Sequence, residues 1–158
     1  MQLRIRWSRP LTINENGSQA AQTSSTLKLL KMKILLIEDS KFQRIANGRA
    51  LIKAGYDVIH AGDGEEGLRS ARENIPDVIL LDMMLPKVSG VEVLRALKDD
   101  VLVKHIPVIV LTGLGQANEA KLLKEGAAAF LMKSVESCEN NSLALIQALQ
   151  SLLTGAKA

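Results

Sequence analysis

Continuous apolar runs are the sequence feature that most constrains the fold of this chain. They cover residues 34–37, 78–81 and 108–111, with no polar residue inside any of them. Strands made of apolar residues alone are buried on both faces, as in parallel sheets covered by helices. Helical segments between the runs would join the strands in parallel, right-handed units. The sequence therefore predicts a three-layer α/β domain.

From residue 32 onward, the pattern alternates strand and helix. We expect strands at about residues 33–37, 56–61, 78–81, 108–111 and 128–132, and helices at about 40–54, 64–73, 91–98, 116–125 and 142–153. Gly55 and Gly126 mark the ends of the first and fourth helices. The expected fold is a doubly wound, five-stranded parallel sheet in the flavodoxin-like order 2-1-3-4-5, with helices on both faces.

Four of the predicted strands lead directly into residues that can take part in chemistry. Glu38 and Asp39 follow the first strand, Asp82 the third, Thr112 the fourth and Lys133 the fifth. The carboxyl ends of parallel strands share one edge of a sheet, where doubly wound proteins bind ligands. Singly, each residue is common in turns or strands. Their joint placement predicts one cleft holding three carboxylates, a hydroxyl and an ammonium.

The chemistry of this predicted cleft favours phosphoryl transfer. Asp39 and Asp82 follow neighbouring strands, and their mutual repulsion would be relieved by a divalent cation; an all-oxygen site suits Mg²⁺. An ammonium from Lys133 and a metal ion beside one aspartate match the charge that builds on a phosphoryl group during transfer. Thr112 could donate to a phosphoryl oxygen. Asp82 is then the candidate nucleophile, forming an acyl phosphate.

With these residues in place, the chain resembles the receiver domains of two-component response regulators, in particular the small stand-alone regulators of chemotaxis. The resemblance covers about residues 32–153. It rests on four stretches: ILLIEDS at 34–40, DMMLPKVSG at 82–90, IPVIVLTG at 106–113 and GAAAFLMK at 126–133. Together these motifs are highly specific for the family.

The resemblance implies a role for each matched residue. Asp82 is expected as the phosphoacceptor. The expected Mg²⁺ ligands are Glu38, Asp39, Asp82 and the Met84 backbone carbonyl. Thr112 is expected as the switch hydroxyl, Lys133 as the phosphate-pairing lysine and Phe130 as the aromatic switch. The phosphoryl group would come from a phosphohistidine on a histidine kinase or histidine phosphotransfer protein. Its added charge would shift a two-state equilibrium and change the face formed by the fourth helix, fifth strand and fifth helix.

Two departures from the family pattern bear on the expected chemistry. Ser134 stands where the family usually has proline after the lysine, so the Lys133–Ser134 bond is either trans, with a reshaped loop, or cis at a cost of roughly 3 kcal/mol. Met84 and Leu114, each two residues after a site residue, are apolar and cannot orient a water molecule by hydrogen bonding. We therefore expect an acyl phosphate that lasts longer than in family members with polar residues at these two positions.

The expected role is a signalling switch rather than an enzyme, apart from slow phosphoryl transfer to itself and autodephosphorylation. One alternative is an aspartate-nucleophile phosphatase on a related fold, although such enzymes carry a second acid where this chain has Met84. Another is a phosphotransfer intermediate in a relay. A flavin module is disfavoured because Glu38 and Asp39 would repel a phosphate after the first strand. The downstream protein target stays open, as does the choice between a monomer and a phosphorylation-dependent dimer.

The charge distribution divides the chain into two parts. The net charge is +3, but residues 1–31 hold five basic side chains and one acidic side chain, which leaves the remainder at a net −1. Direct binding to nucleic acid is therefore not expected. We expect residues 1–31 to be a disordered or non-native extension and residues 32–158 to form the receiver domain. No apolar stretch approaches the length of a membrane span, so we expect no membrane contact and a cytoplasmic protein.

Overall fold

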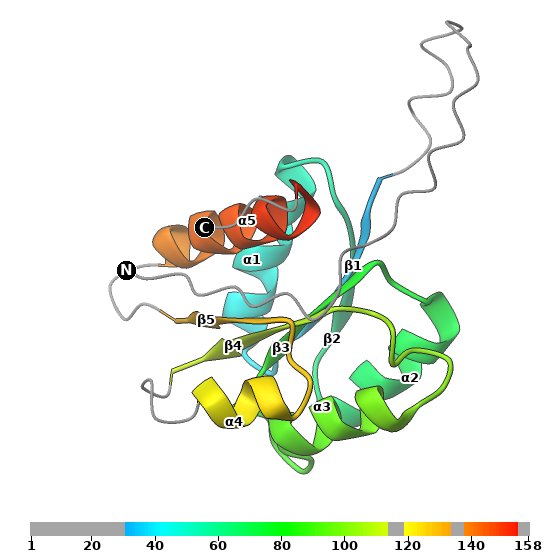
Figure 1. Ribbon diagram of the computed structural model, residues 1–158. Helices are drawn as coiled ribbons and strands as arrows, with labels where there is room; N and C mark the ends of the chain where they lie inside the picture. The colour runs from blue at the N-terminus through cyan, green and yellow to red at the C-terminus, as the bar shows by residue number, and fades with distance from the viewer. Residues whose placement is uncertain (1–30, 114–118, 134–137, 155–158) are drawn as a thin grey trace, which may run out of the picture.

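The computed structural model describes residues 31–113, 119–133 and 138–154. Within these ranges, five strands alternate with five helices (Figure 1). The strands are β1 Lys33–Ile37, β2 Asp57–Ala61, β3 Val78–Asp82, β4 Val108–Thr112 and β5 Ala129–Met132. The helices are α1 Lys41–Lys53, α2 Gly64–Asn74, α3 Gly90–Asp99, α4 Glu119–Lys124 and α5 Cys138–Thr154. No helix in the described ranges is long and apolar enough to cross a membrane.

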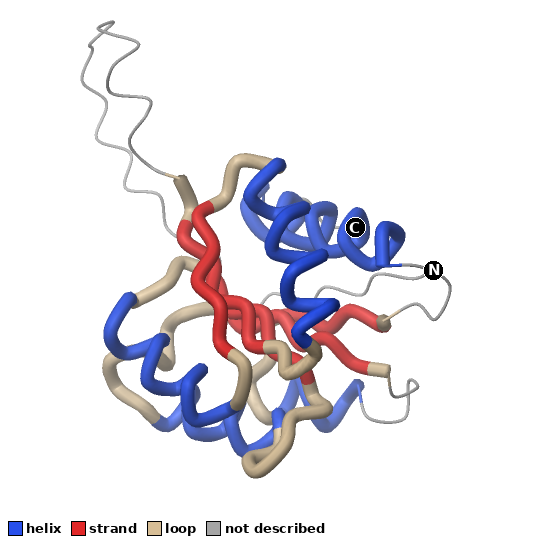
Figure 2. Tube along the Cα trace, turned by 180° about the vertical axis from the view of Figure 1, so that it is seen from behind, coloured by secondary structure: helices blue, strands red, loops and turns tan. Residues whose placement is uncertain are grey.

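The strands form one parallel sheet in the order β2-β1-β3-β4-β5, which confirms the predicted topology. Helices cover both faces of this sheet (Figure 2). On one face, Leu35 and Leu81 belong to a core packed under α2, α3 and α4; on the other, Leu36 and Leu80 belong to a core that includes residues of α1 and α5. Successive side chains of a strand point to opposite faces, which explains why the central strands are apolar at every position.

Local signals set the ends of the helices. The side chains of Ser40, Asp63 and Ser89 cap the first turns of α1, α2 and α3, each accepting a hydrogen bond from a backbone N–H three residues later. Gly55 and Gly126 follow the ends of α1 and α4 with φ angles of 100° and 98°, a left-handed conformation that glycine adopts without a side-chain penalty. Both glycines therefore end helices as predicted.

Several boundaries differ from those predicted, most of them by one residue, and three of the differences bear on the site or on a whole helical turn. Asp82 and Thr112 are the last residues of their strands rather than the first residues of loops; Asp82 pairs in register with Leu111. Helix α5 begins at Cys138, one turn before the expected residue 142. Its first turn is polar, and the apolar pattern that signalled the helix starts only afterwards.

Residues 116–118 of the expected fourth helix, and residues 1–30 of the expected extension, lie outside the described residues.

Candidate functional site

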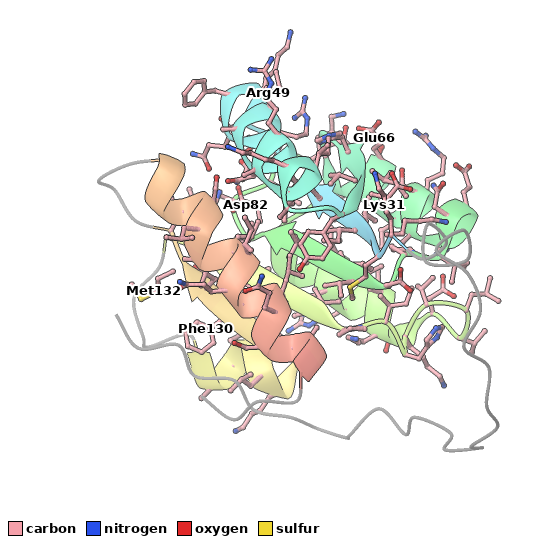
Figure 3. All side chains as sticks on the ribbon, turned by 90° about the horizontal axis from the view of Figure 1, so that it is seen from above. Lys31, Arg49, Glu66, Asp82, Phe130 and Met132 are labelled. Atoms are coloured by element: carbon pink, nitrogen blue, oxygen red, sulfur yellow. The ribbon has the colours of Figure 1, made fainter. Side chains whose placement is uncertain are left out.

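Three carboxylates meet at the carboxyl edge of the sheet. Glu38 and Asp39 leave β1, and Asp82 ends the adjacent strand β3 (Asp82 is labelled in Figure 3). Their ligand oxygens all lie within 4.8 Å of one another. Glu38 and Asp82 are each 1% exposed, whereas Asp39 faces solvent. Two buried carboxylates and one exposed carboxylate around a single point form an oxygen-rich site that is open on one side.

The loop between β1 and α1 is fixed by hydrogen bonds that orient these acids. The backbone N–H of Ser40 donates to Glu38 Oε1 at 3.2 Å. Arg44 Nη1 donates to the backbone carbonyl oxygens of Glu38 and Asp39, at 2.6 and 3.2 Å. Sequence reasoning did not assign Arg44 a role. Its guanidinium holds the peptide groups of the two acids in place without occupying their carboxylate oxygens.

Lys133 closes the site from the end of β5. Its Nζ donates to Asp82 Oδ2 at 2.7 Å, to Glu38 Oε2 at 2.8 Å and to Gln43 Oε1 at 3.0 Å. Its backbone N–H donates to the carbonyl oxygen of Thr112 at 2.8 Å, which continues the pairing of β4 and β5 beyond Met132. The predicted lysine therefore lies among the predicted acids.

Burial and charge shift the ionisation of this cluster. Desolvation raises the pKa of Glu38 to about 7, helped by the neighbouring Asp82 charge and opposed by the hydrogen bond from Lys133. Burial also works against the charged form of Lys133, yet hydrogen bonds to Asp82 and Glu38 outweigh it and raise the pKa of Lys133. One ammonium thus faces three carboxylates, and the excess negative charge favours binding of a proton or a cation.

The loop after β3 shapes the other side of Asp82. The backbone N–H of Met84 donates to Asp82 Oδ1 at 3.1 Å, while the Met84 side chain is 65% exposed. Gly90 begins α3 against this loop, and a Cβ there would lie 2.5 Å from the Asp82 carbonyl oxygen. The glycine that ends the motif of residues 82–90 therefore has a steric basis. The backbone at Gly90 passes so close to the Asp82 carbonyl oxygen that any side chain there would clash with it.

Thr112 and Phe130 lie on the two strands beyond Asp82. Thr112 ends β4 and is 3% exposed, and Phe130 pairs in register with Val110. The Phe130 ring is buried in the same core cluster as Leu122 of α4. Both predicted switch residues are thus packed inside the domain, one at the site and one beneath α4. Two residues used in the sequence-based expectations lie outside the described residues: Leu114, for the lifetime of the phosphoryl group, and Ser134, for the peptide bond after Lys133.

Gln43 is a site residue that sequence reasoning missed. It is the third residue of α1, and its backbone N–H bonds to the capping Ser40 hydroxyl at 3.4 Å. A helix that begins immediately after the acids must direct some side chains of its first turn back toward them. That signal was available in the sequence, but which residue faces the lysine depends on how α1 is rotated about its axis.

Comparisons with known proteins show which family this chain resembles. A sequence model of the family described as response regulator receiver domain matches residues 34–144. The polar-differentiation response regulator DivK of Brucella ovis is 39% identical over 104 residues, which is 65% of this chain and 84% of that protein.

Two solved structures share the fold of this chain, and their sequence identities to it are nearly the same as each other. The chemotaxis response regulator CheY4 of Vibrio cholerae superposes with a TM-score of 0.69 at 30% identity, over 77% of this chain and 98% of that one. The signal receiver domain of a histidine kinase from Syntrophus aciditrophicus gives 0.68 at 31% identity, over 80% and 92%. This chain belongs to the receiver-domain family of two-component response regulators, which are phosphorylation-activated signalling switches.

Proposed function

We propose that this receiver accepts a phosphoryl group on Asp82 from a phosphohistidine of a histidine kinase or histidine phosphotransfer protein. The observation that most directly supports Asp82 as the phosphoacceptor is the hydrogen bonding of its carboxylate. One oxygen accepts a hydrogen bond from the Lys133 ammonium and the other accepts one from the Met84 backbone N–H. Both oxygens are thereby oriented, and positive charge lies beside the position where a phosphoryl oxygen would develop charge. Receiver domains as a family interact with such kinases and with downstream targets.

The transfer forms one bond and breaks one bond. A carboxylate oxygen of Asp82 attacks phosphorus, the new O–P bond forms as the N–P bond to the donor imidazole breaks, and the imidazole nitrogen keeps the electron pair and later takes a proton from solvent. Lys133 then pairs with a phosphoryl oxygen instead of the Asp82 carboxylate. Asp82 is 1% exposed, and this burial would favour transfer over hydrolysis by water.

The acidic cluster fits Mg²⁺ as a cofactor. Glu38, Asp39 and Asp82 supply hard oxygen donors within 4.8 Å of one another, and we assign the Met84 backbone carbonyl as a further ligand. When bound, Mg²⁺ would neutralise charge on the transferring phosphoryl group. Asp39 is the exposed acid, so its side of the cluster leaves room for the coordinated water that Mg²⁺ usually retains.

The response is proposed to pass from Thr112 to Phe130. A phosphoryl oxygen on Asp82 would accept a hydrogen bond from the Thr112 hydroxyl at the end of β4, and the Phe130 ring on β5 would adjust to the space that this movement leaves. Burial of both side chains supports the coupling, because a packed core responds to a shift by repacking. The face formed by α4, β5 and α5 would then bind its target differently.

Two further features are proposed for this receiver. The Asp82 phosphoryl group is expected to be lost slowly by autodephosphorylation, since the exposed Met84 side chain next to it cannot position a water by hydrogen bonding. Residues 32–158 are proposed as the receiver domain, with residues 1–31 as an extension; the family match at 34–144 and the start of β1 at Lys33 support this division.

Phosphotransfer profiling tests the proposed function. Purified, radiolabelled phosphohistidine donors are mixed with the wild type, with Asp82→Asn and with Asp57→Asn, a matched change at an exposed aspartate on β2. We expect label on the wild type and on Asp57→Asn but not on Asp82→Asn. Label that persists on Asp82→Asn would refute the assignment. Onward transfer of the label to a second histidine protein would identify a relay intermediate rather than a terminal switch.

A further inference from the structure

One face of α1 contacts both the site lysine and helix α5. Gln43 and Asn47 are four residues apart, so they lie on the same side of the helix. Gln43 Oε1 accepts a hydrogen bond from Lys133 Nζ at 3.0 Å, and Asn47 Oδ1 accepts one from Ser142 Oγ at 2.9 Å. Asn47 is 6% exposed and Ser142 8%, so this second bond is buried between α1 and α5.

Gln43 differs in kind from the other acceptors of Lys133. An ammonium has three N–H donors, and here they bond to Asp82, Glu38 and Gln43. The first two acceptors are the carboxylates proposed to take the phosphoryl group and the metal ion, so both change their partners during the reaction. The neutral side-chain carbonyl of Gln43 takes part in neither event. It is the contact that can persist from the resting protein to the phosphorylated one.

We propose that Gln43 is a positioning residue for phosphoryl transfer: its side-chain carbonyl holds the Lys133 ammonium beside Asp82, and the Asn47–Ser142 bond fixes α1 against α5 so that this carbonyl stays within reach. The inference rests on the proposed function of Asp82. The Ser40 hydroxyl accepts a hydrogen bond from the Gln43 backbone N–H, so it helps to fix the backbone from which the Gln43 side chain extends.

The lysine needs such a restraint. A lysine side chain has four rotatable bonds and loses considerable rotamer freedom when held in one place. The residue after Lys133 is serine, so no proline ring restricts the chain there. Lys133 must nevertheless move its ammonium from a carboxylate to a phosphoryl oxygen without leaving the site. A fixed neutral acceptor on α1 allows that exchange, because the ammonium can pivot about one hydrogen bond that is kept.

The test compares Gln43→Met with the wild type. Methionine has nearly the same length but only a weak sulfur acceptor. We expect phosphorylation by acetyl phosphate, a small donor that needs no docking surface, to slow by about tenfold, as loss of a bond to a charged group in the site implies. Gln147→Met, the same change at an exposed position of α5, is expected to behave as the wild type.

NMR of the lysine ammonium separates positioning from a general structural effect. In wild type labelled with ¹⁵N and ¹³C, the Lys133 ammonium should exchange slowly with water and show coupling through the hydrogen bond to Gln43 Cδ. Gln43→Met should lose this protection although the variant remains folded under the conditions of the measurement. An unprotected Lys133 ammonium in the wild type, or wild-type transfer rates in Gln43→Met, would overturn the inference. Equal labelling of wild type and Asp82→Asn would instead refute the proposed function.

Discussion

The ammonium of Lys133 lies 2.7 Å from a carboxylate oxygen of Asp82, although 51 positions separate the two residues in the chain. The Asp82 side chain is 2% exposed and the Lys133 side chain 20%, so the ion pair is largely shielded from water. Without a bound cation, this lysine is the group that offsets the charge of both buried acids. The same residue thus has two tasks: it stabilises the resting fold and pairs with the phosphoryl group in the proposed reaction.

Replacing Lys133 by methionine should destabilise the metal-free protein. The change leaves Glu38 and Asp82 buried without their cationic partner, at a cost of about 2–4 kcal/mol in the free energy of unfolding. Urea unfolding with a chelator present measures this, with Lys121→Met at an exposed position of α4 as control. Added Mg²⁺ should recover part of the loss in Lys133→Met. Equal midpoints for both variants and the wild type would contradict the role of the ion pair.

The pKa of Glu38 predicts how pH affects stability and metal binding. Burial raises this pKa from 4.5 to about 7, so the folded protein holds the Glu38 proton more tightly than the unfolded chain does. In chelator, the Glu38 contribution to stability is therefore present below the unfolded pKa and is lost as pH rises toward and through 7. Mg²⁺ must displace this proton, so its affinity should increase with pH up to about 7 and then level off.

Calorimetry in buffers of different ionisation enthalpy measures the proton released per Mg²⁺ bound. Release should be largest below pH 7 and small above it. The variant Glu38→Gln has no proton to release and should show weaker binding with little pH dependence in this range. A wild type that binds Mg²⁺ with the same affinity on both sides of pH 7 would show that Glu38 is ionised throughout.

Gly90→Ala tests the steric basis of the loop after β3. The new Cβ would lie 2.5 Å from the carbonyl oxygen of Asp82 and 2.6 Å from Met83 Cα, both backbone atoms that cannot move aside easily. We expect a loss of about 1–3 kcal/mol in unfolding free energy. Gly113→Ala is the matched control, because a Cβ there meets no atom within 4 Å. Thermal unfolding of both variants measures the difference in stability. If Gly90→Ala loses no more stability than Gly113→Ala, small backbone shifts relieve the clash.

The residues around Asp82 also predict the lifetime of its phosphoryl group. Met84→Asn together with Leu114→Glu would provide polar groups that can orient a water for attack, so the acyl phosphate of the double variant should decay faster than that of the wild type. Loss of label from purified phosphoprotein measures the rate. An unchanged rate would show that neither position limits the access of water.

Much of this site was predictable because parallel strands share a carboxyl edge. Glu38 and Asp82 leave adjacent strands, so sequence pattern and topology together bring them to one place. Lys133 was predictable in position, but its bonds depend on its rotamer, which the sequence pattern does not determine. Gln43 was not predicted, because its contact requires the rotation of α1 about its axis, which tertiary packing of Asn47 and Leu51 determines.

The helix boundaries show the same limit. We expected the fifth helix to begin at about residue 142, just before its apolar residues, whereas α5 begins one turn earlier, at Cys138. Apolar periodicity reports where a helix meets the core, and a first turn without an apolar pattern leaves no such signal. The strand ends were off by one residue for a similar reason, since Asp82 continues the backbone pairing of β3 although its side chain is polar.

Direct identification of the modified residue tests whether Asp82 is the phosphoacceptor. The wild type is phosphorylated with acetyl phosphate and Mg²⁺, trapped with borohydride, which reduces an aspartyl phosphate to homoserine, and mapped by peptide mass spectrometry. We expect homoserine at position 82 and unmodified Asp39 and Asp77. Reduction at another aspartate, or a stable phosphoryl group on a side chain other than a carboxylate, would contradict it.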